Sequence, residues 1–153
     1  MNWAIIRPVL RGILAVLAGI VVLTIASFGI EAAIGSWITD HLPQVWALLI
    51  MLAYTMLSVA AGGYVTAWLA ARSPVRHAVI MGVLEAAMTV WVVVKLPGHG
   101  GPLWPGIAAI VLTVPAAWSG GVMRMKQHSA LDADHMRSLG QMRSLPPEGG
   151  YDT

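Results

Sequence analysis

Cysteine is absent from this chain of 153 residues, and charged residues are scarce. The missing thiols exclude disulfide bonds, iron–sulfur clusters, zinc sites with cysteine ligands and a cysteine nucleophile. Asp, Glu, Lys and Arg together make up 10% of the chain, whereas a soluble domain contains about 25%. Intrinsic disorder is excluded as well, because a disordered chain needs low hydrophobicity together with high charge.

Apolar residues take the place of the missing charge and account for 58% of the sequence. A typical soluble domain contains about 45–50%, and a domain of this size leaves a large share of its surface in water. A lone soluble enzyme is therefore excluded, and the composition predicts an integral membrane protein.

Long runs with at most one charged residue divide the chain into four predicted membrane spans. A helix needs about 20 apolar residues to cross a hydrocarbon core that is about 30 Å thick. The predicted spans cover about residues 10–31, 45–70, 77–95 and 104–123. These spans form a transmembrane domain over residues 1–123, and the expected fold class is an all-α, polytopic membrane four-helix bundle with up-down-up-down topology.

The connections between these spans are short, and the polar tail is the longest segment outside them. The outer connections are expected at about 32–44 and 96–103, and the inner one at 71–76. None of them has room for a soluble domain. Residues 124–153 are expected to form a cytoplasmic tail that is largely disordered, because they combine polar residues with a Pro- and Gly-containing end. A short surface helix over residues 130–143 is the alternative, because Leu131, Leu139 and Met142 lie roughly on one side of such a helix.

The basic residues predict the orientation of the chain in the membrane. Eight of the nine Lys and Arg residues flank the first span, the turn between spans two and three, or the end of span four, and only Lys95 lies on the other side. The positive-inside rule therefore places both termini in the cytoplasm. These residues are topological signals that can also attract anionic lipid, and their spread over three segments argues against nucleic-acid binding.

Small residues recur at every fourth position within three of the spans. Apolar burial does not drive helices together in lipid, whereas close backbone approach and hydrogen bonds do. We therefore expect these residues to pack helices together, within one chain or between two copies. The predicted helix-packing residues are Ser58, Gly62, Gly63 and Ala67 in the second span, Gly82 and Ala86 in the third, and Gly120 and Gly121 in the fourth.

Glu85 is the candidate functional residue, because it lies near the bilayer midplane. It follows Arg76 by about 13.5 Å and precedes Lys95 by about 15 Å at 1.5 Å per helical residue. A carboxylate at that depth is costly unless it is paired, hydrated or protonated. The hydroxyls expected to partner it belong to Thr89, one turn further on, and to Thr24, Ser27, Thr55, Ser58 and Thr113 on other spans.

Two interpretations of Glu85 remain open at this point. With Thr89 it can form a proton or cation site, which is the usual meaning of an intramembrane acid. Alternatively, it is a neutral structural acid that is hydrogen-bonded across helices or paired with another subunit. No intramembrane Lys or Arg of the same chain is available to pair with it.

Other polar residues give no pattern of a metal, cofactor or catalytic site. Glu31, Asp40, His41 and His99 are expected on the outer side, but they show no ligand spacing typical of a metal site. The sequence contains neither a nucleophile elbow, nor a zinc-protease helix, nor a phosphate-binding loop. We therefore expect no metal, no cofactor and no enzymatic activity.

Three segments resemble a group of uncharacterised small bacterial membrane proteins with four helices. The shared pattern is Gly-Gly-Tyr at 62–64, Pro-x-Arg-His at 74–77 and Pro-x-Ala-Trp-x-Gly-Gly at 115–121. The group also has an acidic residue at the end of the first span, matched here by Glu31, often with a His one turn later, where this chain has Gly35. The resemblance implies the same fold and a bacterial cytoplasmic membrane, but no activity.

Two functions are compatible with the sequence. The first is a non-enzymatic accessory or scaffold subunit that associates with itself or with other membrane-protein subunits, as the small-residue stripes and short connections indicate. The second is a small transporter or channel that uses the Glu85 carboxylate. Four helices without an evident internal repeat are few for a carrier with alternating access.

Overall fold

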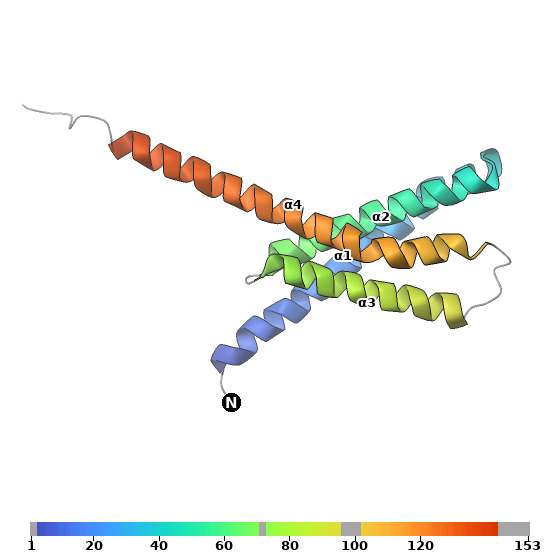
Figure 1. Cartoon of the computed structure of the whole chain (residues 1–153), viewed down its shortest axis with the longest axis horizontal. Helices are drawn as coiled ribbons and strands as arrows, with labels where there is room; N and C mark the ends of the chain where they lie inside the picture. Colours follow the sequence, from blue (N-terminus) through green and yellow to red (C-terminus); the bar gives the residue numbers. More distant parts are fainter. Residues whose placement is uncertain (1–2, 71–72, 96–101, 144–153) are drawn as a thin grey trace, which may run out of the picture.

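The computed structural model describes residues 3–70, 73–95 and 102–143. These residues form four helices and no strand: α1 (Trp3–His41), α2 (Gln44–Leu69), α3 (Pro74–Lys95) and α4 (Trp104–Arg143). Consecutive helices run in opposite directions and cross near the middle of the molecule (Figure 1). The all-α four-helix fold predicted from the sequence is confirmed.

All four helices are long and apolar enough to cross a membrane. Large apolar side chains cover their outer surfaces, and Phe28, Leu57 and Trp91 are 71%, 70% and 60% exposed, respectively. Soluble monomers rarely expose apolar patches larger than a few hundred Å², so a surface of this kind belongs in lipid. The chain is therefore a multi-pass membrane protein.

The first outer connection is much shorter than the sequence indicated. We expected a loop over residues 32–44, but this expectation is wrong because α1 stays helical to His41 and only Leu42 and Pro43 separate it from α2. The Leu42 N–H still donates to the Ile38 carbonyl oxygen at 3.1 Å. Pro8 lies in the second turn of α1, and no proline occurs between it and Pro43. The helix therefore continues until it comes close to Pro43, whose ring cannot be accommodated in a helix interior.

The structure also differs from the expected disordered tail. Residues 124–143 continue α4 as one helix, so that α4 has 40 residues in all, and it contains Pro115 without ending there. This continuation is rich in Ala, Leu, Met, Lys and Arg, which favour helices. A pair one turn apart supports it, because His128 Nδ1 lies 2.8 Å from Asp132 Oδ2. The remaining tail, 144–153, lies outside the described residues.

Helix α2 lies between α1 and α4 and touches both through glycine. A Cβ at Gly62 would lie 2.7 Å from the Gly19 carbonyl oxygen of α1. On the other side of α2, a Cβ at Gly63 would lie 2.9 Å from the Ala117 Cα of α4. Such distances leave no room for a side chain, so the backbones of these helices touch directly.

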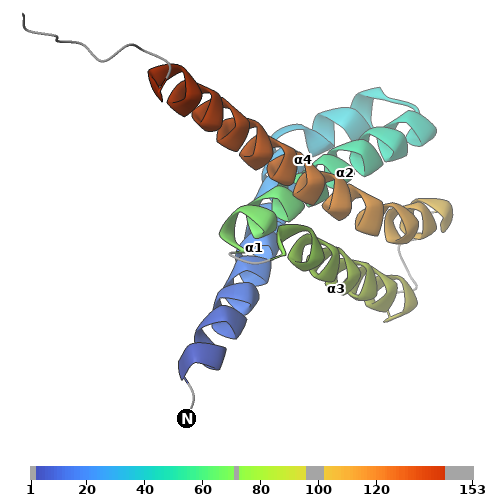
Figure 2. The ribbon, with the colours of Figure 1, turned by 60° about the vertical axis from the view of Figure 1, so that its left-hand side comes forward.

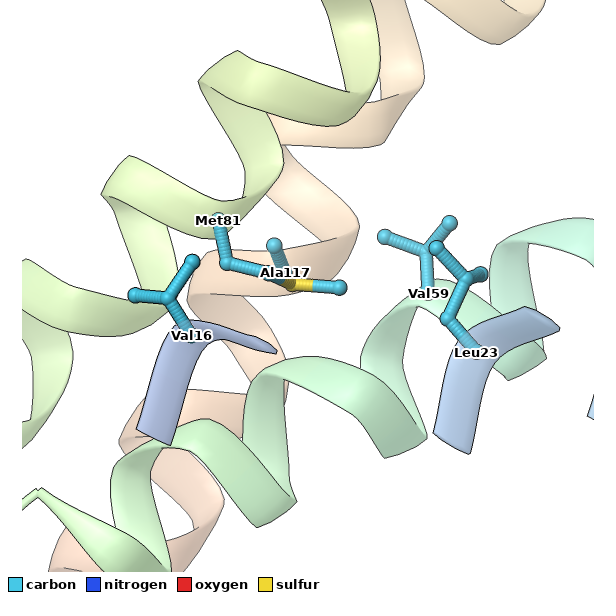
Figure 3. Close-up of a cluster of buried hydrophobic side chains, with 5 residues drawn as sticks. All are labelled: Val16, Leu23, Val59, Met81 and Ala117. Atoms are coloured by element: carbon cyan, nitrogen blue, oxygen red, sulfur yellow. The ribbon is translucent and has the colours of Figure 1, made fainter. Parts of the chain in front are cut away.

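Helix α3 completes the core by packing on α4. A Cβ at Gly82 would lie 2.7 Å from the Ala117 Cβ, and a Cβ at Gly121 would lie 2.8 Å from the Ala78 Cβ. Met81 is fully buried and extends from α3 toward the α1 and α2 side chains of the core. Figure 3 shows this cluster, which consists of Val16, Leu23, Val59, Met81 and Ala117.

Seven of the eight residues predicted to pack helices are buried, and Ala86 is half-buried. The glycines among them approach other helices of the same chain. Away from this crossing the helices diverge: the first turns of α1 and the last turns of α4 extend in different directions (Figure 2).

Candidate functional site

Glu85 lies on α3 one turn beyond the buried core. Met81, four residues earlier, is fully buried, and its terminal methyl would lie 2.7 Å from a Cβ at Gly62 of α2. Glu85 itself is half-buried. Among the residues that the structure describes, its carboxylate has no hydrogen-bond or ion-pair partner.

Five of the six hydroxyl groups expected to partner Glu85 bond to their own helices instead, and the sixth, that of Ser27, has no partner among the described residues. Thr89 donates to the backbone carbonyl of Glu85 at 3.0 Å, not to its carboxylate. Thr55 donates in the same way to Met51 at 2.8 Å, and Thr113 donates to Ala109 at 2.6 Å. Thr24 and Ser58 follow this pattern too. A Ser or Thr hydroxyl in a helix reaches the carbonyl one turn back without help from a second helix, which is why the predicted cross-helix bonds do not form.

Two hydroxyl oxygens inside the bundle are buried and have no partner among the described residues, those of Ser27 and Thr66. Thr66 is fully buried on α2, and its hydroxyl abuts Gly19 of α1 so closely that any side chain at position 19 would overlap it. Gly19 therefore makes room for a polar group at the crossing of the two helices.

Glu31 has a partner that the sequence analysis missed. The Tyr54 hydroxyl of α2 donates to Glu31 Oε2 of α1 at 3.2 Å. Tyr54 is 8% exposed, so its ring is held between the helices while its hydroxyl reaches the acid. Glu31 lies eleven residues before Leu42 and Tyr54 eleven residues after Pro43, which places them opposite each other in a hairpin with a two-residue turn.

The outer acidic and histidine residues do not gather into one site. Asp40 and His41 lie nine and ten residues after Glu31 on the same helix, about 14 Å along its axis. The His41 ring stacks on Trp37 with 5.2 Å between ring centroids, and His99 lies outside the described residues. Within the described ranges, no group of three His, Cys, Asp or Glu side chains could hold a metal ion.

Described basic residues gather at one end of the bundle, as the sequence predicted from their positions. Arg7 and Arg11 precede the core contacts of α1, Arg76 lies in the first turn of α3, and Arg124 follows the core contacts of α4. Lys95 lies at the opposite end, where its ammonium sits 5.4 Å from the Trp91 ring centroid. We call the end that carries the arginines the basic end.

Two hollows of different chemistry open near the basic end. The first is a pocket of about 490 Å³ between α2, the start of α3 and α4, and it includes Trp68, Pro74, Arg124, His128 and Asp132. The second is an apolar groove of about 540 Å³ between α1 and α3. The first pocket also includes Ser129, but its hydroxyl donates to the carbonyl oxygens of Met125 and Lys126 and not to the His128 ring. The described residues of the pocket therefore do not form the nucleophile–base contact of a catalytic triad.

Together, the four apolar helices and their lipid-compatible surfaces define an all-α, multi-pass membrane protein. In comparisons with known proteins, no family model, no curated protein and no solved structure matches this chain.

Proposed function

We propose that this protein is a non-enzymatic accessory or scaffold subunit that uses the extension of α4 to hold another protein chain. The observation that carries this proposal is the length of α4. Its 40 residues span about 60 Å at 1.5 Å per residue, about twice the thickness of a bilayer's hydrocarbon core. Residues 124–143, here called the α4 arm, extend beyond the other helices (Figure 1).

The apolar side chains of the α4 arm support a role in protein contact. Leu131, Met136 and Leu139 are exposed, the first two at 66% and 69%. At 100° per residue these three side chains fall on one side of the helix, which also carries His128, Asp132 and His135, whereas Arg137 lies on the opposite side. Most of the stability of a helix in a protein comes from packing of its apolar side chains, so burial of these three side chains against a second chain would stabilise the α4 arm.

The glycine contacts support the same conclusion, because they are already made within this chain. Each of the predicted packing glycines lies against another helix of the same chain: Gly62, Gly63, Gly82, Gly120 and Gly121. We infer that a partner binds elsewhere. Beyond its first turns, where the Tyr64 hydroxyl of α2 donates to Gln127 Oε1, the α4 arm presents apolar side chains that the other described helices leave open. The partner is either a second copy or a subunit of a larger membrane complex.

A photo-crosslinking amino acid in the α4 arm tests this function in native membranes. Placed at Leu131 or Met136, it should give one discrete protein adduct whose mass distinguishes a second copy from another subunit. Placed at Arg137, on the other side of the arm, it should give none. Adducts with lipid alone at Leu131 and Met136 would mean that the arm lies on the membrane surface, and the proposed function would be wrong.

The proposed location is a bacterial cytoplasmic membrane, with both termini and the α4 arm in the cytoplasm. The positions of eight of the nine basic residues support this orientation. The resemblance to small bacterial four-helix membrane proteins supports the bacterial setting and is itself a proposal. A reporter that works only in the cytoplasm should be active when it is fused to either terminus, and a reporter that works only on the external side should be inactive there.

A small transporter or channel remains the second candidate, because the Glu85 carboxylate has no partner among the described residues. The test is ion or proton flux into liposomes that contain the wild-type protein, Glu85→Gln or the control Glu31→Gln. This function requires flux above the protein-free background that Glu85→Gln abolishes and Glu31→Gln retains. A scaffold gives background flux in all three.

A further inference from the structure

The apolar groove between α1 and α3 has the dimensions of a ligand site. Its volume of about 540 Å³ falls within the range of about 300–1,000 Å³ that is typical of small-molecule pockets. On α1 it extends from Val9 to Ile20, about 16 Å along the helix axis. On α3 it extends from His77 to Leu84. The two helices diverge from a short region of contact, which leaves the groove open to the surrounding lipid (Figure 2).

The wall of this groove is apolar except at the basic end. Ile13, Val16, Leu17 and Ile80 are among its lining residues, and His77 is the only titratable residue among the described ones that line it. A ligand that fills the groove must therefore be a hydrocarbon over most of its length. An acyl chain meets this requirement, and the surrounding membrane supplies it.

His77 and Gly12 touch each other within the groove, near its basic end. A Cβ at Gly12 would lie 2.6 Å from His77 Nε2, so the imidazole packs directly on the α1 backbone. His77 Nδ1 lies 3.1 Å from the Ser73 carbonyl oxygen. Because a carbonyl only accepts hydrogen bonds, Nδ1 carries the proton of that bond. Nε2 then lies on the α1 side of the ring, next to the groove.

Exposed arginines flank this contact on both helices. Arg11 immediately precedes Gly12, Arg7 lies one turn earlier, and Arg76 immediately precedes His77. No Asp or Glu occurs in α1 before Glu31 or in α3 before Glu85. On α4, Asp132 near the basic end is paired with His128. The three arginines are not among the described residues that line the groove, but Arg11 and Arg76 are the chain neighbours of its lining residues Gly12 and His77. The surface beside this end of the groove is therefore positively charged, and guanidinium groups match the geometry of a phosphate.

We propose that the α1/α3 groove binds one anionic phospholipid, with an acyl chain along the apolar wall and the headgroup phosphate between Arg11, Arg76 and His77. A charged mouth above an apolar wall complements a lipid of this kind, and basic pockets between membrane helices bind such headgroups. A second copy of this chain fits less well, because it would bring the same arginines to the same place. This site does not depend on the α4 arm or on the proposed scaffold function.

The test measures how much lipid stays with the full-length protein. The protein is reconstituted in equal amounts of phosphatidylglycerol and phosphatidylcholine and transferred to mild detergent, and the bound lipid is counted by native mass spectrometry. We expect one retained phosphatidylglycerol per chain and a clear preference over phosphatidylcholine. Equal retention of the two lipids by the wild-type protein would refute a site for an anionic headgroup.

Two matched pairs of variants locate the site. The double variant Arg11→Gln, Arg76→Gln should reduce the preference for phosphatidylglycerol roughly thirtyfold, whereas Lys126→Gln on the α4 arm should leave it unchanged. Leu84→Trp should block the groove and remove the bound lipid, whereas Val83→Trp, on the same helix but outside the groove, should not. The proposal is wrong if Lys126→Gln has the effect of the arginine variant, or if Leu84→Trp retains as much lipid as Val83→Trp.

The arginine double variant is expected to fold like the wild-type protein. Arg11 and Arg76 are exposed, so the arginine variant tests the headgroup site without disturbing the helix crossing. Added inorganic phosphate provides a further check, because it carries the headgroup charge without an acyl chain. We expect excess phosphate to leave the lipid bound; displacement by phosphate would show that the groove contributes nothing, and it would contradict the proposal.

Discussion

A methyl group at Gly120 should force α2 and α4 apart. In Gly120→Ala the new Cβ would overlap the Ala60 carbonyl oxygen of α2, and it would lie 2.9 Å from the Tyr64 backbone nitrogen. Both neighbours are backbone atoms, which cannot rotate away as a flexible side chain can. The strain must therefore be relieved by a shift of the whole helix.

The size of this effect follows from the same contacts. Overpacking of a tightly packed core costs about 1–3 kcal/mol, and we expect the upper part of that range because backbone atoms are involved. Replacing glycine with alanine within a helix also contributes about 1 kcal/mol in the opposite direction. Gly29→Ala provides the matched control, because a Cβ at Gly29 has no neighbour within 4 Å. The difference between the two variants isolates the cost of packing.

The free energy of unfolding of both variants can be measured by titration with a denaturing detergent in mixed micelles, followed by circular dichroism. We expect Gly120→Ala to be about 2 kcal/mol less stable than Gly29→Ala. Adding Gly63→Ala, which strains the same helix crossing, should cost less in the Gly120→Ala background than alone, because neighbouring sites are not additive. If Gly120→Ala and Gly29→Ala differ by less than about 0.5 kcal/mol, the direct backbone contact between α2 and α4 is refuted.

Three further predictions concern single contacts and are checked by the same titration. Tyr54→Phe should lower the unfolding free energy by about 0.6 kcal/mol, which is the average for a hydrogen bond between membrane helices. In a Glu31→Ala background the same substitution should have no effect. An equal loss of stability in both backgrounds would mean that the bond to Glu31 contributes nothing. Ser73 has a φ of 51°, so Ser73→Val should be about 1–2 kcal/mol less stable than Ser73→Gly, and equal stability would contradict a left-handed backbone there. Asp132→Asn breaks only an exposed pair with His128 and should change stability by less than about 0.5 kcal/mol; a larger loss would indicate that the α4 arm packs against another group.

The number of helices could be predicted from the sequence because it depends on two coarse properties, charge exclusion and length. The ends of the helices could not. The sequence between Glu31 and Pro43 is polar enough to resemble a loop, yet it contains no residue that stops a helix before Pro43. The α4 arm is similar: its polarity indicated disorder, but its residues individually favour a helix, and α4 supplies the costly first turn from which it continues.

The contact between Glu31 and Tyr54 could not be predicted, because it depends on where α1 and α2 end. With an expected loop over residues 32–44, Glu31 and Tyr54 had no defined register, although they lie at equal distances from the two-residue turn. The prediction that hydroxyl groups would bond to the Glu85 carboxylate was wrong for a different reason. Sequence position predicts which residues lie at one depth in the membrane, whereas the choice between a local carbonyl and a distant carboxylate depends on side-chain rotation.

The two proposed binding surfaces follow from how the glycine crossing is built. Contacts such as those of Gly62 and Gly120 bring backbones together at one level of the bundle, and helices that touch so closely at one level must diverge above and below it unless their crossing angles are small. That divergence opens the α1/α3 groove. It also leaves the α4 arm without a helical neighbour beyond its first turns, where the Tyr64 hydroxyl of α2 donates to Gln127 Oε1 at 2.7 Å. A lipid in the groove would fill the space between diverging helices near the basic end, whereas a protein chain on the arm would cover the described part of α4 that extends past α2 and α3. The arginine variant therefore leaves the crosslinks at Leu131 unchanged if both proposals hold, because the two surfaces share no residue.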